Sequence, residues 1–338
     1  MNPVELAEAV VGGDHRALAR AITLVENRED GYRDLVSRLH AHAGDAAVVG
    51  ITGSPGSGKS TLVDKMAATY RDRGLTVGVI AIDPSSPYTG GAVLGDRIRM
   101  GSTVGDMDTF IRSMSARGSL GGLSAATADA VTALSAFGKD RIVIETVGAG
   151  QNEIDIVRAA DSVAVLVPPG TGDDVQMLKA GILEIADLFV VNKADLDGVD
   201  RTVRELRETI EYREGDVPGS VGRGADGADA DGWSPRIVET VANRGEGIEA
   251  VLSALADHRT YLRESGEAET RRRRRYAEQI RTLLREDVNS MLATEVDARG
   301  GLDRIVDRVM AGETDPYAAV DELLAPVAAS LSEDADGG

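Results

Sequence analysis

Apolar residues follow two alternating patterns through the middle of the chain. Between residue 46 and about residue 258, short continuous apolar runs predict strands, and segments with helical spacing separate them. The expected strands are 47–52, 76–82, 109–114, 141–146, 162–168, 187–192 and 235–241. The expected helices lie near 60–73, 124–137, 152–160, 175–185, 200–213 and 247–263. Near-continuous apolar strands separated by helices indicate an α/β fold with a mostly parallel, doubly wound sheet.

The two ends of the chain show helical spacing without a strand pattern. Residues 1–45 predict two or three short helices ahead of the sheet. Residues 46–263 form the expected sheet domain, and 264–338 form a C-terminal helical extension with helices at 267–293, 300–311 and 315–331. Within the sheet domain, residues 215–232 contain six Gly and four Asp and almost nothing to bury, which predicts a mobile acidic surface loop.

Composition narrows the class of protein. The 338 residues are 42% hydrophobic, so they can bury a sizeable core, and they include no cysteine for a disulfide or a thiolate metal site. The 56 acidic and 37 basic side chains give a net charge of −19, which argues against nonspecific binding to nucleic acid. No apolar run reaches transmembrane length and no signal pattern opens the sequence, so we expect no membrane segment and a cytoplasmic protein.

A run of five arginines at 271–275 stands out against this acidic background. One interpretation is a nucleic-acid patch. The other is a solvated helix face whose arginines pair with acidic neighbours. The net negative charge of the chain favours the second interpretation.

One glycine-rich segment carries the clearest chemistry. It follows the expected strand 47–52, precedes an expected helix, and fits the phosphate-loop pattern G-x-x-x-x-G-K-[ST]. Its backbone N–H groups and the helix N-terminus would point at a phosphate. Lys59 would reach the β and γ phosphates, and the Ser60 hydroxyl would ligate Mg²⁺. The nucleotide-binding residues expected here are Gly53, Ser54, Pro55, Gly56, Ser57, Gly58, Lys59, Ser60 and Thr61.

A second motif indicates which base is bound. Asn192-Lys193-Ala194-Asp195 follows an apolar strand. The Asp195 carboxylate would accept hydrogen bonds from guanine N1–H and the exocyclic amine, a donor pair that adenine lacks. Asn192 would brace the loop and contact N7, and the Lys193 stem would pack over the base. The alternative is that Asn192 and Asp195 merely cap the next helix.

The end of the last expected strand offers a weaker guanine motif. Backbone groups of Val241 and Ala242 would contact guanine O6, although only Ala242 fits the expected Ser-Ala-Lys-like string. An ordinary strand end is the alternative.

Acidic residues follow two other expected strands. Because ligands of open α/β sheets bind at the carboxyl ends of strands, Asp83 and Glu145 are placed to hold Mg²⁺, Glu145 at the Walker-B position. Asp96 ends a glycine-rich loop and would support the metal or position the attacking water. Gly148 would offer its N–H to the γ-phosphate. Gln151 would orient water, or would simply begin a helix.

These segments together resemble the MeaB/ArgK GTPases, which are G-protein chaperones of adenosylcobalamin-dependent methylmalonyl-CoA mutase. The resemblance extends over nearly the whole chain and rests on GSPGSGKST, AIDPSSP, ETVGAGQNE and VPPGTGDDVQMLKAGILEIADLFVVNKAD. It implies binding and slow hydrolysis of Mg·GTP, and homodimers that form through the C-terminal helices. It also implies a mutase as partner, which would hold the cobalamin itself.

Residue roles carried over by the resemblance fall on the motif positions. Metal and phosphate roles fall on Lys59, Ser60, Asp83, Asp96 and Glu145, and catalysis is expected from Lys59, Asp96, Glu145 and Gln151. Lys179 matches an additional switch that communicates with the mutase, although its chemistry alone favours an ordinary surface lysine.

Two other functions remain as alternatives. One is a metal-insertion GTPase for another metalloenzyme. With four histidines and no cysteine, the chain has few ligands for a metal ion to be delivered. The other is an ArgK-type ATPase or kinase linked to amino-acid transport, which the guanine motif opposes.

Overall fold

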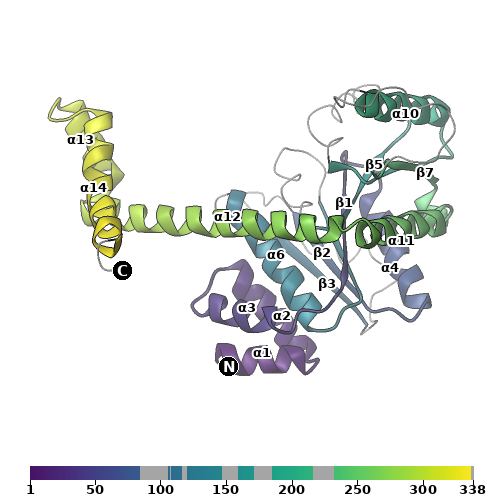
Figure 1. Cartoon of the computed structure of the whole chain (residues 1–338), viewed down its shortest axis with the longest axis horizontal. Coiled ribbons are helices and arrows are strands. Elements are labelled where there is room, and N and C mark those ends of the chain that lie inside the picture. Colours follow the sequence, from purple (N-terminus) through teal and green to yellow (C-terminus); the bar gives the residue numbers. More distant parts are fainter. Residues whose placement is uncertain are drawn as a thin grey trace. The chain divides into compact units, whose positions relative to one another are not determined.

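In the computed structural model, a sheet of seven parallel strands forms the centre of residues 1–276 (Figure 1). The strands lie in the order β3-β2-β4-β1-β5-β6-β7. Each expected strand is present and differs from its expected bounds by no more than one residue at either end. The strands are β1 (Ala47–Gly53), β2 (Val77–Asp83), β3 (Thr109–Ser115), β4 (Arg141–Glu145), β5 (Ser162–Val167), β6 (Leu188–Asn192) and β7 (Arg236–Thr240).

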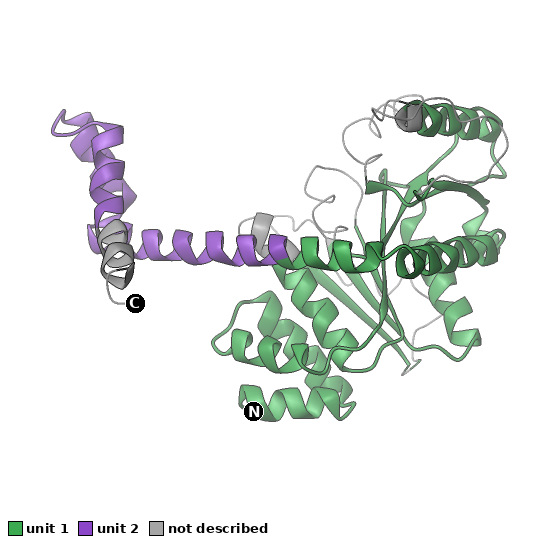
Figure 2. Ribbon diagram, in the orientation of Figure 1, with its two compact units in different colours: residues 1–276 green, residues 277–338 purple. Residues whose placement is uncertain are grey.

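The structure describes residues 1–83, 106, 108–115, 120–146, 159–170, 185–215 and 232–335. Two compact units, residues 1–276 and 277–338, divide the chain within its longest helix (Figure 2). The helices expected at 152–160 and 175–185 lie essentially outside the described residues, as does the acidic loop 215–232 apart from its two end residues. The functional division into an N-terminal extension, a sheet domain and a C-terminal arm stays a prediction.

Helices cover both faces of the sheet, as the apolar runs of the strands require. One face packs against α6 (Leu120–Ala136) and, beside β5 and β6, against α10 (Val199–Gly215). The opposite face packs against α4 (Lys59–Asp72) and α11 (Ile248–Glu264). Strands β1, β5 and β6 are therefore buried along their whole length, and all seven strands reach one edge of the sheet with their carboxyl ends.

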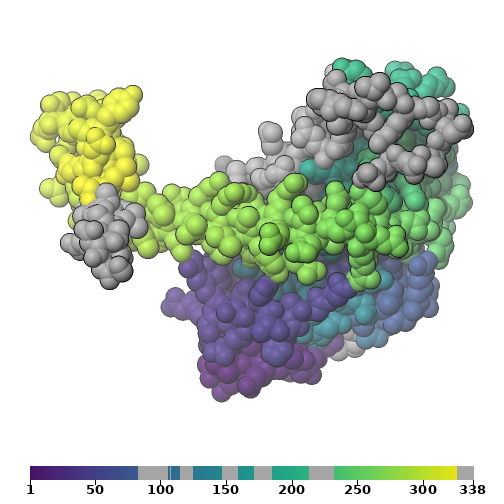
Figure 3. Space-filling view, in the orientation of Figure 1, coloured from purple at the N-terminus to yellow at the C-terminus, as the bar shows by residue number. Residues whose placement is uncertain are grey.

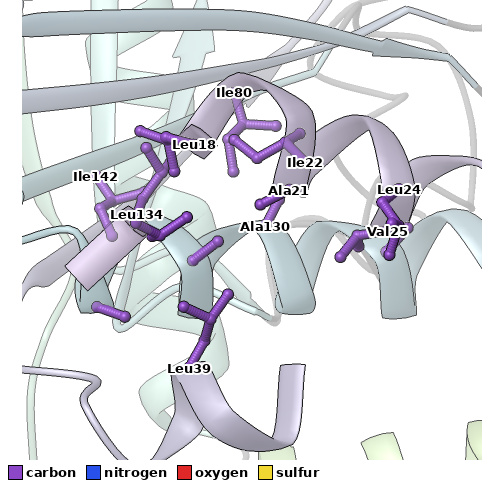
Figure 4. Packing of buried hydrophobic residues seen from close by; sticks show 14 of the residues in the cluster. Leu18, Ala21, Ile22, Leu24, Val25, Leu39, Ile80, Ala130, Leu134 and Ile142 are labelled. Carbon is purple, nitrogen blue, oxygen red and sulfur yellow. The ribbon is translucent and has the colours of Figure 1, made fainter. Parts of the chain in front are cut away.

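Three N-terminal helices complete the first unit, in agreement with the expected two or three. They are α1 (Pro3–Val11), α2 (His15–Glu26) and α3 (Tyr32–His40), shown in purple in Figure 3. Asn2 and Asp14 cap the first two helices by accepting hydrogen bonds from backbone N–H groups. Leu18 and Ile22 of α2 pack with Leu134 of α6 in a core that continues to the sheet (Figure 4). Full burial of each such side chain contributes about 1.5–3 kcal/mol.

The C-terminal segments are helical, as expected. Helices α12 (Glu267–Ala298), α13 (Gly301–Met310) and α14 (Pro316–Ala335) follow one another. Arg299 and Arg308 both pair with Glu322 within the second unit. Within the described part of the chain, no helix is both long and apolar enough to cross a membrane.

The arginine run at the start of α12 divides between two environments. Arg273 pairs only loosely with Glu269, and both side chains are about four-fifths exposed, which matches the expected solvated face. Arg271 and Arg275 instead reach Asp187 and Asp161, which precede β6 and β5. Those two arginines therefore attach α12 to the amino-terminal edge of the sheet, and the periodicity of the helix gave no sign of this.

Candidate nucleotide-binding site

The phosphate-loop motif forms a tight turn between β1 and α4. Gly53 has φ 140° and Gly58 has φ 96°, both in the region that favours glycine. A Cβ atom at position 53 would lie 2.2 Å from the backbone oxygen of Leu166, and one at position 58 would lie 2.3 Å from Asn192 Nδ2. The chain can close the loop this tightly only because these two positions carry no side chain.

Lys59 is held inside this loop. Its Nζ donates to the backbone oxygens of Gly53 at 2.7 Å and Ser54 at 3.0 Å, and the residue is buried. The ammonium group thus lies within the turn whose backbone would cradle a phosphate. Pro55 and Gly56 form the exposed tip of the loop.

The loop and the start of α4 leave polar groups available for an anion. Among the described residues, no side chain caps α4 at Gly58, so none of them satisfies the first N–H groups of the helix. The buried hydroxyl oxygens of Ser54 and Ser57 likewise have no hydrogen-bond partner within the part of the chain that the structure describes. Unpaired buried polar groups at a helix N-terminus are what a bound phosphate would satisfy. Thr61 lies in the first turn of the same helix.

Ser60 and Glu145 meet at the carboxyl edge of the sheet. The Ser60 hydroxyl donates to Glu145 Oε1 at 2.6 Å, and Glu145 is only 6% exposed at the end of β4. Asp83 ends the neighbouring strand β2, two residues beyond Ala81, which lies opposite Glu145. A hydroxyl and a carboxylate in contact form a hard oxygen set that fits Mg²⁺. Ser60 and Glu145 would hold the ion, and Asp83 has its backbone beside them.

Asn192 joins the phosphate loop to the end of β7. Its Nδ2 donates to the backbone oxygen of Ser57 at 2.7 Å. Its Oδ1 accepts from the Thr240 hydroxyl at 3.0 Å and from the Ala242 N–H at 3.1 Å. Asn192 therefore ties the end of β6 to the phosphate loop and to the end of β7, and Thr240 takes part although no sequence motif indicated it. A threonine one strand away gives no local signal of this contact.

The guanine motif continues from β6 into an exposed turn. Lys193 has φ 63°, and its side chain is exposed. The Ala194 N–H donates to the backbone oxygen of Thr240 at 2.9 Å, which fixes the turn beside β7. The Asp195 carboxylate is 31% exposed and lies 3.2 Å from the guanidinium of Arg244. Arg244 is a second residue of this site that no sequence motif indicated.

The described residues bring the phosphate loop, Glu145 and the guanine motif to one edge of the sheet. Val241 and Ala242 lie directly beyond β7 at that edge, and the Val241 N–H donates to the backbone oxygen of Glu246 at 3.1 Å. Four expected site residues lie outside the described residues, as does the side chain of Asp83. These four are Asp96, Gly148, Gln151 and Lys179.

Comparisons with known proteins agree on one family. The model of the methylmalonyl-CoA mutase-associated GTPase MeaB matches residues 18–297. A "Putative GTPase" of Pyrococcus abyssi is 48% identical over 323 residues, which cover 95% of each chain. GTPase ArgK of Escherichia coli is 34% identical over 308 residues, or 87% of this chain and 88% of that one.

More distant relatives are similar over most of the chain. The mouse "Methylmalonic aciduria type A homolog, mitochondrial" is 31% identical over 338 residues, which cover 94% of this chain and 78% of that protein. A crystal structure of a LAO/AO transport system kinase has a TM-score of 0.64 at 26% identity, covering 96% of this chain and 97% of that one. With a phosphate loop, an acidic strand end and an Asn-Lys-Ala-Asp turn at one sheet edge, this chain belongs to the MeaB family of P-loop GTPases.

Proposed function

We propose that this chain is a cytoplasmic, Mg²⁺-dependent GTP switch that serves an adenosylcobalamin-dependent methylmalonyl-CoA mutase as a chaperone. In this proposal it binds GTP, hydrolyses it slowly to GDP and phosphate, and controls loading or protection of the cofactor of the mutase. The proposal that this chain binds a nucleotide rests mainly on the hydrogen bonds of the Asn192 side chain. This side chain bonds both to the phosphate loop and to the strand end beside Asp195, so phosphate and base recognition share one rigid edge.

Each residue of the site has a role that its position supports. Lys59 and the loop N–H groups neutralise and orient the β and γ phosphates, and no covalent protein intermediate is needed. Ser60 and Glu145 would hold Mg²⁺ together with Asp83, and the ion would supply positive charge to neutralise the phosphates. Asp195 reads the guanine edge, and its carboxylate is exposed enough to be reached.

The switch residues complete the proposal. Asp96 and Gln151 would position the attacking water, and the Gly148 N–H would detect the γ-phosphate. Lys179 would lie in the segment that communicates with the mutase. A partner that binds one switch conformation more tightly would shift the population toward it. The family description names a mutase-associated GTPase, which supports this partner.

The second unit supports assembly into a homodimer. Apolar side chains at four-residue spacing, Ile280, Leu284 and Val288, are between 45% and 58% exposed on α12. The exposed apolar side chains of α13 and α14 are Leu302, Val306, Met310, Tyr317, Val320 and Leu324. Uncovered apolar positions at helical spacing favour contact with another helix, and a second copy of the chain is the proposed occupant.

Nucleotide competition tests the guanine assignment. The protein is loaded with fluorescent mant-GDP, and unlabelled GTP, GDP and ATP are titrated against it with Mg²⁺ present. GTP and GDP should displace the probe, whereas ATP should not at the same concentrations. Displacement by ATP as effective as that by GTP would favour the transport-kinase alternative.

Co-sedimentation with a purified methylmalonyl-CoA mutase tests the partner. The amount bound should differ between GDP and a non-hydrolysable GTP analogue. If GTP binds but no mutase is retained with either nucleotide, the chaperone role is wrong, and a GTPase with another client, such as a metalloenzyme, remains.

A further inference from the structure

Arg244 lies at the guanine site without belonging to any of its motifs. It ends the short 3-10 helix η1 (Ala242–Arg244) that follows β7. Its Nη2 atom is 3.2 Å from Asp195 Oδ2, across 49 residues of sequence. The Arg244 side chain is 58% exposed, so it can leave this position without disturbing a core. The carboxylate expected to read guanine therefore already faces a cation.

The backbone around Arg244 is fixed, although its side chain is exposed. Gly245 and Gly247 have φ of 77° and 80°, and the Val241–Glu246 bridge closes the turn that contains Arg244 and Gly245. A Cβ at position 247 would lie 2.3 Å from the backbone oxygen of Glu239, so the turn depends on that glycine. The turn therefore fixes the backbone from which the Arg244 side chain reaches Asp195.

The two candidate partners of Asp195 are chemically alike. Guanine presents N1–H and an exocyclic amine on one carbon, which is a guanidine group within a ring. A guanidinium side chain presents the same pair of parallel N–H donors, and carboxylates accept this pair bidentately. One carboxylate cannot accept both pairs along the same edge. Guanine and Arg244 therefore compete for Asp195.

We infer that Arg244 is an internal competitor of guanine, holding the Asp195 carboxylate in the nucleotide-free protein until the base displaces it. The inference rests on the proposed guanine site and adds a residue that sets its affinity. An exposed ion pair contributes little, so the competition lowers guanine-nucleotide affinity by no more than about fivefold. Salt screens exposed charges, so this penalty shrinks as ionic strength rises.

The test measures the dissociation constant of mant-GDP for the wild type, Arg244→Ala and Arg244→Lys at low and high salt. Arg236→Ala is the control, because Arg236, at the start of β7, also forms an exposed ion pair, with Asp257 of α11. Arg244→Ala should bind mant-GDP up to about fivefold more tightly than the wild type at low salt, and as tightly as the wild type at high salt. The affinity of Arg244→Lys at low salt should lie between those of the wild type and Arg244→Ala, and the affinity of Arg236→Ala should match that of the wild type.

A double-mutant cycle identifies the target of the arginine. With Asp195→Asn and a xanthosine diphosphate probe, adding Arg244→Ala should no longer change affinity, because the carboxylate is gone. Unchanged or weaker GDP binding by Arg244→Ala alone would overturn the competitor role. Failure of every variant, wild type included, to bind guanine nucleotide would instead refute the proposed function and this inference with it.

Discussion

Arg271 and Arg273 lie two residues apart in the same arginine run, yet the structure predicts very different effects of removing them. The two guanidinium Nη atoms of Arg271 donate to Asp187 at 2.9 and 3.1 Å, and one also donates to the backbone oxygen of Asp161 at 3.1 Å. The Asp187 side chain is only 7% exposed. Arg273, on a solvated surface, pairs with Glu269 at 3.8 Å and with no other acidic residue in the described ranges.

The magnitude follows from what each substitution leaves behind. Arg271→Ala removes the guanidinium from the buried Asp187 carboxylate, which keeps the Val163 N–H at 2.9 Å and the neighbouring His258 ring at 3.3 Å. Breaking a buried pair costs about 3–5 kcal/mol, and the partial exposure of Arg271 reduces this to about 2–4 kcal/mol. Arg273→Ala should change the free energy of unfolding by no more than about 0.5 kcal/mol.

The only tryptophan of the chain lies beside Asp187, so its fluorescence can follow unfolding in this region. Trp233 donates from Nε1 to the backbone oxygen of Asp187 at 2.8 Å, so its fluorescence reports on the region that Arg271 supports. Urea unfolding followed by this fluorescence should show a lowered midpoint for Arg271→Ala and an unchanged one for Arg273→Ala. Equal midpoints for the two variants would refute the claim that Arg271 anchors α12 to the sheet.

Three further predictions concern the loop, its brace and a buried histidine. Gly53→Ala should abolish mant-GDP binding, because its Cβ would lie 2.2 Å from a backbone oxygen. At Gly56 an added Cβ would have no atom within 4 Å, so Gly56→Ala should lower the free energy of unfolding, measured by a thermal melt, by only about 1 kcal/mol. Asn192→Ala removes three buried hydrogen bonds and should weaken mant-GDP binding at least about tenfold, and unaltered affinity would contradict its bracing role. Burial lowers the pKa of His258 below its ordinary value of 6.5, although the nearby Asp187 carboxylate opposes this. As pH falls below 6.5, the His258 imidazole is therefore protonated in the unfolded chain before it is protonated in the folded protein, which favours unfolding. The urea midpoint of the wild type should decrease over this pH range by more than that of His258→Gln.

The sequence predicts the strands well because a strand buried on both faces requires a continuous run of apolar residues, and that run is visible in the sequence. Runs such as Val163–Val167 contact helices on both faces, so their continuous apolar character follows directly from their position. The phosphate loop is equally local, since Gly53 and Lys59 are six residues apart and contact each other. Both features depend on neighbours in the chain, and a single sequence carries that information.

Contacts between distant segments could not be predicted in this way. Asn192 bonds to Ser57 across 135 residues, and Arg271 to Asp187 across 84, and neither spacing follows from periodicity. The arginine run illustrates the point, since one face of the helix is solvated while Arg271 enters a buried pair. Which arginine turns inward is set by where α12 passes the sheet edge, and that depends on the whole fold.

The proposed function depends on Asp195 accepting hydrogen bonds from guanine at the carboxyl edge of this sheet. Competition of mant-GDP and its xanthosine counterpart on the wild type and on Asp195→Asn tests it most directly. Loss of the charged acceptor should weaken GDP binding by about a hundredfold, roughly 3 kcal/mol, and xanthosine diphosphate should become the tighter ligand. An Asp195→Asn protein that still prefers GDP with wild-type affinity would contradict the account.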